Sequence, residues 1–276
     1  MFKHILKTLT LAIAVTQFGC GIENGSSQLT STAIQYDGLT KVSGLAVEAD
    51  TGQRFVLDSQ VGIFLLREDG STKMLWEKPD ELPELTDLCA IGGYRFVVGA
   101  NGDGYLVDLA LGTSRQHFCL EPGWDPGFDE DLRHLNKAVA CDVDAQLIYG
   151  QPQTVPARDP SAPLRSEVAQ YDLGTGADIQ WQPLPDNQYH AGGMTLTDQG
   201  LLILGSGHAL KVFNPTSGEV VNRMSLGHLG IKEIDGLNWD KHLQQLNVLD
   251  GAQSIWVEIP AKLLPFITPS TDVNVD

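Results

Sequence analysis

The chain has few positive charges. Of its 276 residues, 18 are Lys or Arg and 35 are Asp or Glu, which gives a formal net charge of -17. A surface of that sign repels a polyanion, so nucleic acid is not an expected partner. Charged residues make up only 19% of the chain and hydrophobic residues 42%. This composition excludes disorder and a coiled coil, and it allows one core of ordinary size or two small ones.

Several motifs of common catalytic and nucleotide-binding sites are missing. The sequence has no H-E-x-x-H, no C-x-x-C and no Walker loop. The segment Gly205-Ser206-Gly207 also lacks the G-x-S-x-G spacing of a nucleophile elbow. Glycine and proline are abundant instead, with 29 and 14 residues. Together with the many Thr, Val and Leu residues, they predict short strands that are joined by tight turns.

Near the N-terminus, an apolar stretch is too short to span a bilayer. It runs from Leu9 to Val15, follows Lys3 and Lys7, and precedes Cys20, whereas a transmembrane helix needs ~20 apolar residues. The pattern resembles a bacterial lipoprotein signal, in which cleavage before a cysteine frees a residue that is then acylated. Gly19 matches the small residue before the cut, although Gln17 and Phe18 depart from the preferred residues.

This resemblance implies that residues 1–19 are a lipoprotein signal peptide and that residues 20–35 are the lipidated cysteine and a polar tether. Cys20 would carry the acyl chains, palmitate among them, and hold the protein in the cell envelope. Gly21 favours the outer membrane if the host has one. Loss of Lys3 and Lys7 makes the exported chain two charges more negative, so membrane attachment depends on the lipid anchor alone. An ordinary secretory signal that leaves Cys20 as a thiol is the alternative.

The other cysteines are Cys89, Cys119 and Cys141. Exported proteins usually meet an oxidising compartment, so one disulfide and one buried thiol are expected. Three buried, unpaired cysteines agree equally well with the apolar strands around Cys89 and Cys141. The spacing does not decide which cysteines pair.

The chain repeats itself about five times. Residues 43–58 align without a gap with residues 235–250, so that Val56-Leu57-Asp58 matches Val248-Leu249-Asp250, and weaker copies begin near positions 86, 136 and 191. Each copy contains strands and tight turns, and four strands in ~40–50 residues indicate a β-propeller blade. The prediction is an all-β fold: a β-propeller of five four-stranded antiparallel blades over residues 36–262, followed by a C-terminal tail over residues 263–276.

Ring closure can be predicted in two ways. The last copy has no clear fourth strand, which residues 32–36 could supply across the termini. A sixth blade shared between residues 22–40 and 261–276 is the alternative. Two blades open with Ser43-Gly44-Leu45 and Asp235-Gly236-Leu237, and they resemble the NHL-repeat, SMP-30/gluconolactonase-like and SdiA-regulated-type propellers. That resemblance implies the fold and no particular activity.

Polar residues open the innermost strands and are expected to point into the central channel. They are Asp87, Asn136, His190 and Asp235. Carboxylate and amide oxygens suit Ca²⁺, and the likeness to the gluconolactonase-like enzymes implies a divalent metal that polarises a lactone carbonyl. Ser43 stands where that family has a glutamate ligand. A channel that binds only water is the alternative to a metal site.

Two long insertions, residues 121–135 and 151–165, are expected on the face where the innermost strands begin. The first contains the candidate partner-binding residues Trp124, Asp125, Phe128, Asp129 and Asp131. Exposed aromatic residues often anchor a partner, although a solvated acidic loop would have the same composition. The sequence thus favours an envelope-tethered binding or scaffolding module for a protein, peptide or glycan. The alternative is a divalent-metal-dependent hydrolase, of the lactonase or phosphoesterase type, that uses the channel.

Overall fold

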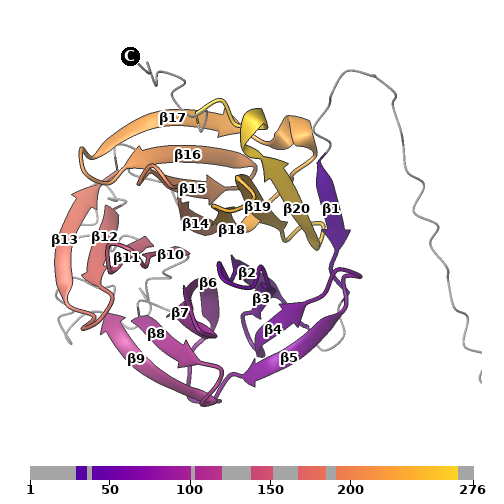
Figure 1. Ribbon diagram of the computed structural model, residues 1–276, viewed down its shortest axis with the longest axis vertical. Helices are drawn as coiled ribbons and strands as arrows, with labels where there is room; N and C mark the ends of the chain where they lie inside the picture. The colour runs from indigo at the N-terminus through magenta and orange to yellow at the C-terminus, as the bar shows by residue number, and fades with distance from the viewer. Residues whose placement is uncertain are drawn as a thin grey trace, which may run out of the picture.

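The computed structural model describes residues 29–35, 39–100, 103–119, 138–151, 167–184 and 191–266. In these ranges, twenty strands form five four-stranded antiparallel sheets. The sheets surround a common axis like the blades of a propeller (Figure 1). The all-β prediction with five blades is therefore confirmed. In the same ranges, no helix is long and apolar enough to cross a membrane.

In blades 1 to 4 the strands follow the chain from the axis outwards, and in blade 5 the N-terminal strand is the outermost one (Figure 1). Blade 1 contains β2 (Val42–Val47), β3 (Arg54–Asp58), β4 (Gly62–Leu66) and β5 (Thr72–Glu77). Blade 2 contains β6 (Leu85–Gly92), β7 (Arg95–Ala100), β8 (Asp103–Asp108) and β9 (Thr113–Cys119). Blade 3 contains β10 (Ala138–Asp142), β11 (Leu147–Gln151), β12 (Glu167–Asp172) and β13 (Asp178–Pro183). Blade 4 contains β14 (Gly193–Leu196), β15 (Leu202–Ser206), β16 (Ala209–Asn214) and β17 (Glu219–Ser225). Blade 5 contains β18 (Ile234–Asp240), β19 (Gln245–Asp250), β20 (Ile255–Pro260) and β1 (Thr30–Ala33).

The N-terminal strand closes the ring. β1 pairs antiparallel with β20, with Thr30 opposite Glu258 and Ala33 opposite Ile255. This pairing confirms closure across the termini, and the alternative of a sixth blade is wrong because β1 completes blade 5. The propeller thus begins before the expected boundary at residue 36. It also extends past residue 262, since Leu264 is fully buried in the core of blade 5.

The core lies between neighbouring blades. One apolar cluster combines Phe55 and Ile63 of blade 1 with Leu88 and Phe96 of blade 2, and all four are buried. Strand β3 is buried along nearly its whole length, as expected for a strand that is covered on both faces. Each blade therefore needs its neighbours to bury its apolar faces.

The two ends of the ring differ in their connections. Four strands, an even number, return the chain to the side on which the blade began, so every innermost strand starts at the same end of the axis. We name this end the loop face, because the chain crosses there from one blade to the next. The opposite end, where the innermost strands finish in short turns, is the turn face.

At the loop face, buried acidic side chains hold the connections in place. Asp58 is fully buried, and its carboxylate accepts hydrogen bonds from the Lys41 amide at 2.7 Å and from the Gln60 and Val61 amides at 2.9 Å. In blade 5, the equivalent Asp250 accepts from the Lys232 amide at 2.7 Å. The repeated Val-Leu-Asp motif thus marks a structural clamp.

Candidate functional site

Asp87 closes the axis at the loop face. It is fully buried, and its carboxylate accepts hydrogen bonds from the amides of Leu88 at 2.9 Å and Val139 at 3.1 Å. The Met194 amide of blade 4 also donates to this group. Burial raises the pKa of Asp87 well above its usual range although these amides favour the ionised form, and the charge of nearby Asp235 adds to the rise. One side chain therefore links the innermost strands of blades 2, 3 and 4.

Asp235 occupies a different position in the repeat. It lies at a bulge between β18 and β19, where the register shifts between Ile234 and Gly236. The same irregularity in blade 1 places Ser43 at the equivalent position. A Cβ atom on Gly251 would collide with the Asp235 carboxylate, so this glycine provides the space for that side chain. The two aspartates are electrostatically coupled at the loop face.

Of the four predicted metal ligands, the structure describes only Asp87 and Asp235. Within the described ranges, no group of three or more His, Cys, Asp or Glu residues is arranged to hold a metal ion. The remaining predicted site residues lie outside the described residues: Cys20, Asn136, His190, Trp124, Asp125, Phe128, Asp129 and Asp131.

Both insertions connect strand ends at the loop face. The first joins β9, which ends at Cys119, to β10, which begins at Ala138; the second joins β11, which ends at Gln151, to β12. Ala138 lies opposite Gln151 in the sheet, and Cys119 lies opposite Asp103 at the start of β8. The flanking strands therefore agree with the prediction that the two insertions share one face.

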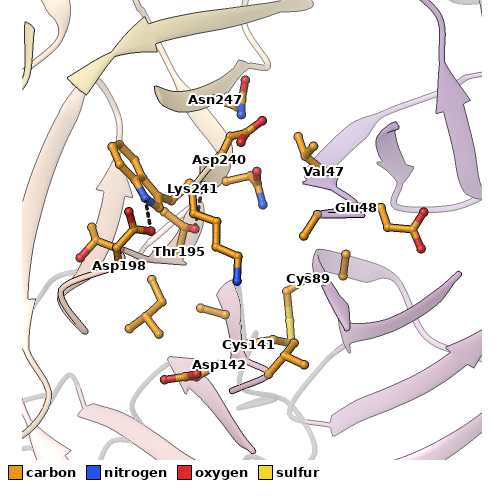
Figure 2. Close-up of a pocket in the computed structure, with 18 of the residues that line it drawn as sticks. Val47, Glu48, Cys89, Cys141, Asp142, Thr195, Asp198, Asp240, Lys241 and Asn247 are labelled. Atoms are coloured by element: carbon orange, nitrogen blue, oxygen red, sulfur yellow. Dashed lines mark hydrogen bonds between the residues drawn. A yellow bond between two sulfur atoms is a disulfide. The ribbon is translucent and has the colours of Figure 1, made fainter. Parts of the chain in front are cut away.

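A cavity opens at the other end of the axis, which sequence reasoning missed. Its volume is about 700 Å³, and its walls come from the innermost strands of all five blades and from their turns (Figure 2). Apolar side chains of Leu88, Met194 and Leu237 form part of its lining. This volume lies in the range of small-molecule sites, which combine apolar walls with a few polar groups.

A disulfide between Cys89 and Cys141 forms part of the cavity wall (Figure 2). It joins β6 of blade 2 to β10 of blade 3, with 5.8 Å between the Cα atoms and a sequence separation of 52. The bond decides the pairing that the sequence left open, since these residues become neighbours only when the blades stand side by side.

Charges surround the cavity. Its lining contains six carboxylate residues: Glu48, Asp50, Asp142, Asp144, Asp198 and Asp240. The cationic side chains in the lining are Arg54 and Lys241, and Arg54 is paired with Glu258. Several carboxylates also hold turns, as Asp240 does by accepting hydrogen bonds from the His242 and Leu243 amides at 2.9 Å. The mouth of the cavity is therefore negative overall.

Comparisons with known proteins identify no family for this chain. No protein-family model matches it, and no curated protein is significantly similar to it. Among solved structures, the chain is similar to a chain in the crystal structure of a nidogen/laminin complex, with 14% sequence identity and a TM-score of 0.48. The match covers 80% of this chain and 81% of the other.

Proposed function

We propose that this chain is a binding or scaffolding module that is tethered to a bacterial envelope through a lipidated Cys20, in the outer membrane where the host has one. The observation that carries the proposal is the closed ring of five blades, to whose loop face both long insertions connect. A closed ring to which long loops connect on one face is suited to binding. Its partner is an envelope protein, a peptide or a glycan.

The direction of β1 supports this arrangement. Because β20 runs from the loop face to the turn face and β1 is antiparallel to it, Thr30 is the end of β1 nearer the turn face. The residues between Cys20 and Thr30 can extend over at most about 35 Å. An anchor at Cys20 would therefore hold the turn face closer to the membrane and leave the loop face directed towards partners.

Trp124 and Phe128 are the proposed anchors of the partner, with Asp125, Asp129 and Asp131 around them. Large aromatic side chains contribute much of the binding energy at protein interfaces. In pull-down experiments from envelope extracts, a Trp124→Ala, Phe128→Ala variant should lose most of the captured partner. Met74→Ala is the matched control, because Met74 is an exposed apolar residue on the outermost strand of blade 1. Equal capture by all three proteins would contradict the proposal.

The lipid anchor has its own test. Mass spectrometry of the mature N-terminus should find an acylated Cys20, and a Cys20→Ala variant should leave the membrane fraction. An unmodified Cys20 at the mature N-terminus would overturn the envelope tether while leaving the binding proposal to the pull-down.

The metal-dependent hydrolase is a second candidate, since Asp87 and Asp235 lie close enough at the loop face for the charge of Asp235 to add to the raised pKa of Asp87. A metal that binds only the folded chain must raise its melting temperature. Ca²⁺ should therefore raise that temperature in the wild type and not in an Asp235→Asn variant. The absence of any shift in excess Ca²⁺, Mg²⁺, Mn²⁺ or Zn²⁺ would remove this candidate.

A further inference from the structure

The wall of the turn-face cavity contains a buried donor. Asn247 of β19 lines the cavity and is 1% exposed. Its Oδ1 atom accepts a hydrogen bond from Trp256 Nε1 at 3.1 Å, and because an indole N–H can only donate, the orientation of the Asn247 amide is fixed. The Nδ2 atom of Asn247 has no partner among the described residues. A buried donor of this kind calls for an acceptor oxygen in the cavity.

Lys241 supplies a second donor over the same space. Its Nζ atom lies 3.6 Å from Asp144 Oδ2, and the two side chains are 53% and 90% exposed. The pair joins turns of blades 5 and 3, which are not neighbours in the ring, so Lys241 extends over the cavity (Figure 2). An exposed ion pair contributes little to stability, and the ammonium group can therefore exchange Asp144 for a ligand.

The same cavity also offers acceptors. The Oδ1 atom of Asn238 has no partner among the described residues, and the carboxylates of Asp50 and Asp142 lie in the lining. Six carboxylates against two cations make the site unfavourable for an anion. A simple cation has no acceptor oxygen and would leave Asn247 Nδ2 without a partner. The lining thus suits a ligand that both donates and accepts hydrogen bonds and carries no negative charge.

We propose that the turn-face cavity binds an uncharged polyhydroxylated ligand, a mono- or disaccharide. Each sugar hydroxyl can accept from Asn247 Nδ2 or Lys241 Nζ and donate to a carboxylate or amide oxygen. The C–H faces of the ring pack on the apolar part of the lining, which includes Leu237. The volume of about 700 Å³ accommodates a ligand of this size.

The first experiment is isothermal titration calorimetry of the mature chain with glucose, maltose, N-acetylglucosamine and its β-1,4-linked disaccharide. Glucuronate and putrescine are the charged comparison probes. At least one neutral saccharide should bind, and both charged probes should bind at least tenfold more weakly. The proposal is overturned if none of the neutral saccharides binds, or if glucuronate or putrescine binds as tightly.

Variants test whether binding occurs in this cavity. Leu196→Trp places a large side chain in the lining and should abolish saccharide binding. Ile179→Trp is its matched control, because Ile179 is 52% exposed on the outermost strand of blade 3, and it should bind as the wild type does. Equal binding by both tryptophan variants would place the ligand elsewhere and contradict the proposal.

Two further variants test the donors. Lys241→Met should weaken binding about tenfold, the loss expected for a hydrogen bond from a charged donor. Asn247→Asp keeps the acceptor for Trp256 and replaces the buried donor by an oxygen, so it should also lose affinity. Because this change buries a charge, the melting temperature of the Asn247→Asp variant is measured in parallel. If that variant does not fold, the Leu196→Trp variant decides whether the saccharide binds in this cavity.

The result is separable from the proposed partner binding at the loop face. Saccharide binding without capture of an envelope partner would support the cavity and contradict the loop-face proposal. Capture of an envelope partner without saccharide binding would support the loop-face proposal and contradict the saccharide site in the cavity.

Discussion

The two ends of the central axis use polar residues in opposite ways. At the loop face, Asp87 is fully buried and its carboxylate accepts hydrogen bonds from the amides of neighbouring blades. At the turn face, the blades leave a cavity of about 700 Å³, where Asn247 Nδ2 has no partner among the described residues. Polar groups near the axis of this ring thus hold the strands together where they touch, and line a cavity where the strands separate.

Glycine accounts for the close contact at the loop face. A Cβ atom on Gly44 would lie 2.9 Å from the Cα atom of Asp87, and one on Gly193 would lie 2.6 Å from the Cα atom of Gly236. Side chains at these positions would push the innermost strands apart. The strands can therefore converge at the loop face, and Asp87 fills the space on the axis.

The largest effect is expected from the disulfide in the cavity wall. Closing a loop of this length restricts the unfolded chain, and the replacement of both Cys89 and Cys141 by Ala should lower the free energy of unfolding by about 4 kcal/mol. Denaturant titration with and without reductant provides the measurement. The reductant should affect the wild type and leave the double variant unchanged. Equal midpoints for the oxidised wild type and the variant would show that the bond does not support the ring.

A smaller loss is expected at the loop-face clamp. Asp58→Ala leaves the buried amides of Lys41, Gln60 and Val61 without their acceptor, which should lower the free energy of unfolding by about 3 kcal/mol. Asp69→Ala is a suitable control, because Asp69 holds only an exposed turn through the Ser71 amide. If the two variants unfold at the same denaturant concentration, the loop face does not depend on its buried carboxylates.

Asp87 should make the stability of the loop face depend on pH. Its pKa is raised in the folded chain, so the folded state binds a proton more tightly than the unfolded state does. The stabilising contribution is complete below the ordinary Asp pKa of about 3.9 and is lost as the pH rises through the higher folded value. Relative to Asp87→Asn, the wild type should lose up to about 1.4 kcal/mol per pH unit in this window. A difference that is independent of pH from 4 to 8 would contradict this prediction.

The smallest effect is expected across the mouth of the cavity. Asp144→Ala removes the partner of Lys241, but the two side chains are largely exposed, so the free energy of unfolding should change by less than about 0.5 kcal/mol. Thermal unfolding in low and high salt provides the measurement. A large loss of stability would show that the pair joins blades 3 and 5 structurally and is not available to a ligand.

The repeat made the fold predictable. The copies that start near residues 43, 86, 136, 191 and 235 correspond to innermost strands that start at Val42, Leu85, Ala138, Gly193 and Ile234. Closure by the N-terminal segment was also predictable, because the last copy lacks its fourth strand and a lone blade edge would stay unpaired. The actual strand is Thr30–Ala33, which lies somewhat earlier than the expected residues 32–36. The residues of Thr30–Ala33 are polar and small, so they give only a weak strand pattern in the sequence.

The candidate sites were less predictable. Asp87 and Asp235 are both predicted to point into the channel, yet Asp235 aligns with Ser43 at a bulge, whereas Asp87 replaces the glycine that follows it in blades 1 and 5. One position along a strand changes which way a side chain points. The bulges decide this direction, and a single sequence does not reveal them.

The sequence by itself determined the repeat, the all-β class and the acidic character of the chain, and it favoured five blades over six. These properties depend on local patterns of apolar residues, turns and charge, which can be read along the chain. The tertiary structure alone decided that Cys89 pairs with Cys141, that Asp87 closes the axis and that a cavity opens beneath Lys241. Each of these features combines residues from different blades, and their distances exist only once five separate segments meet around one axis.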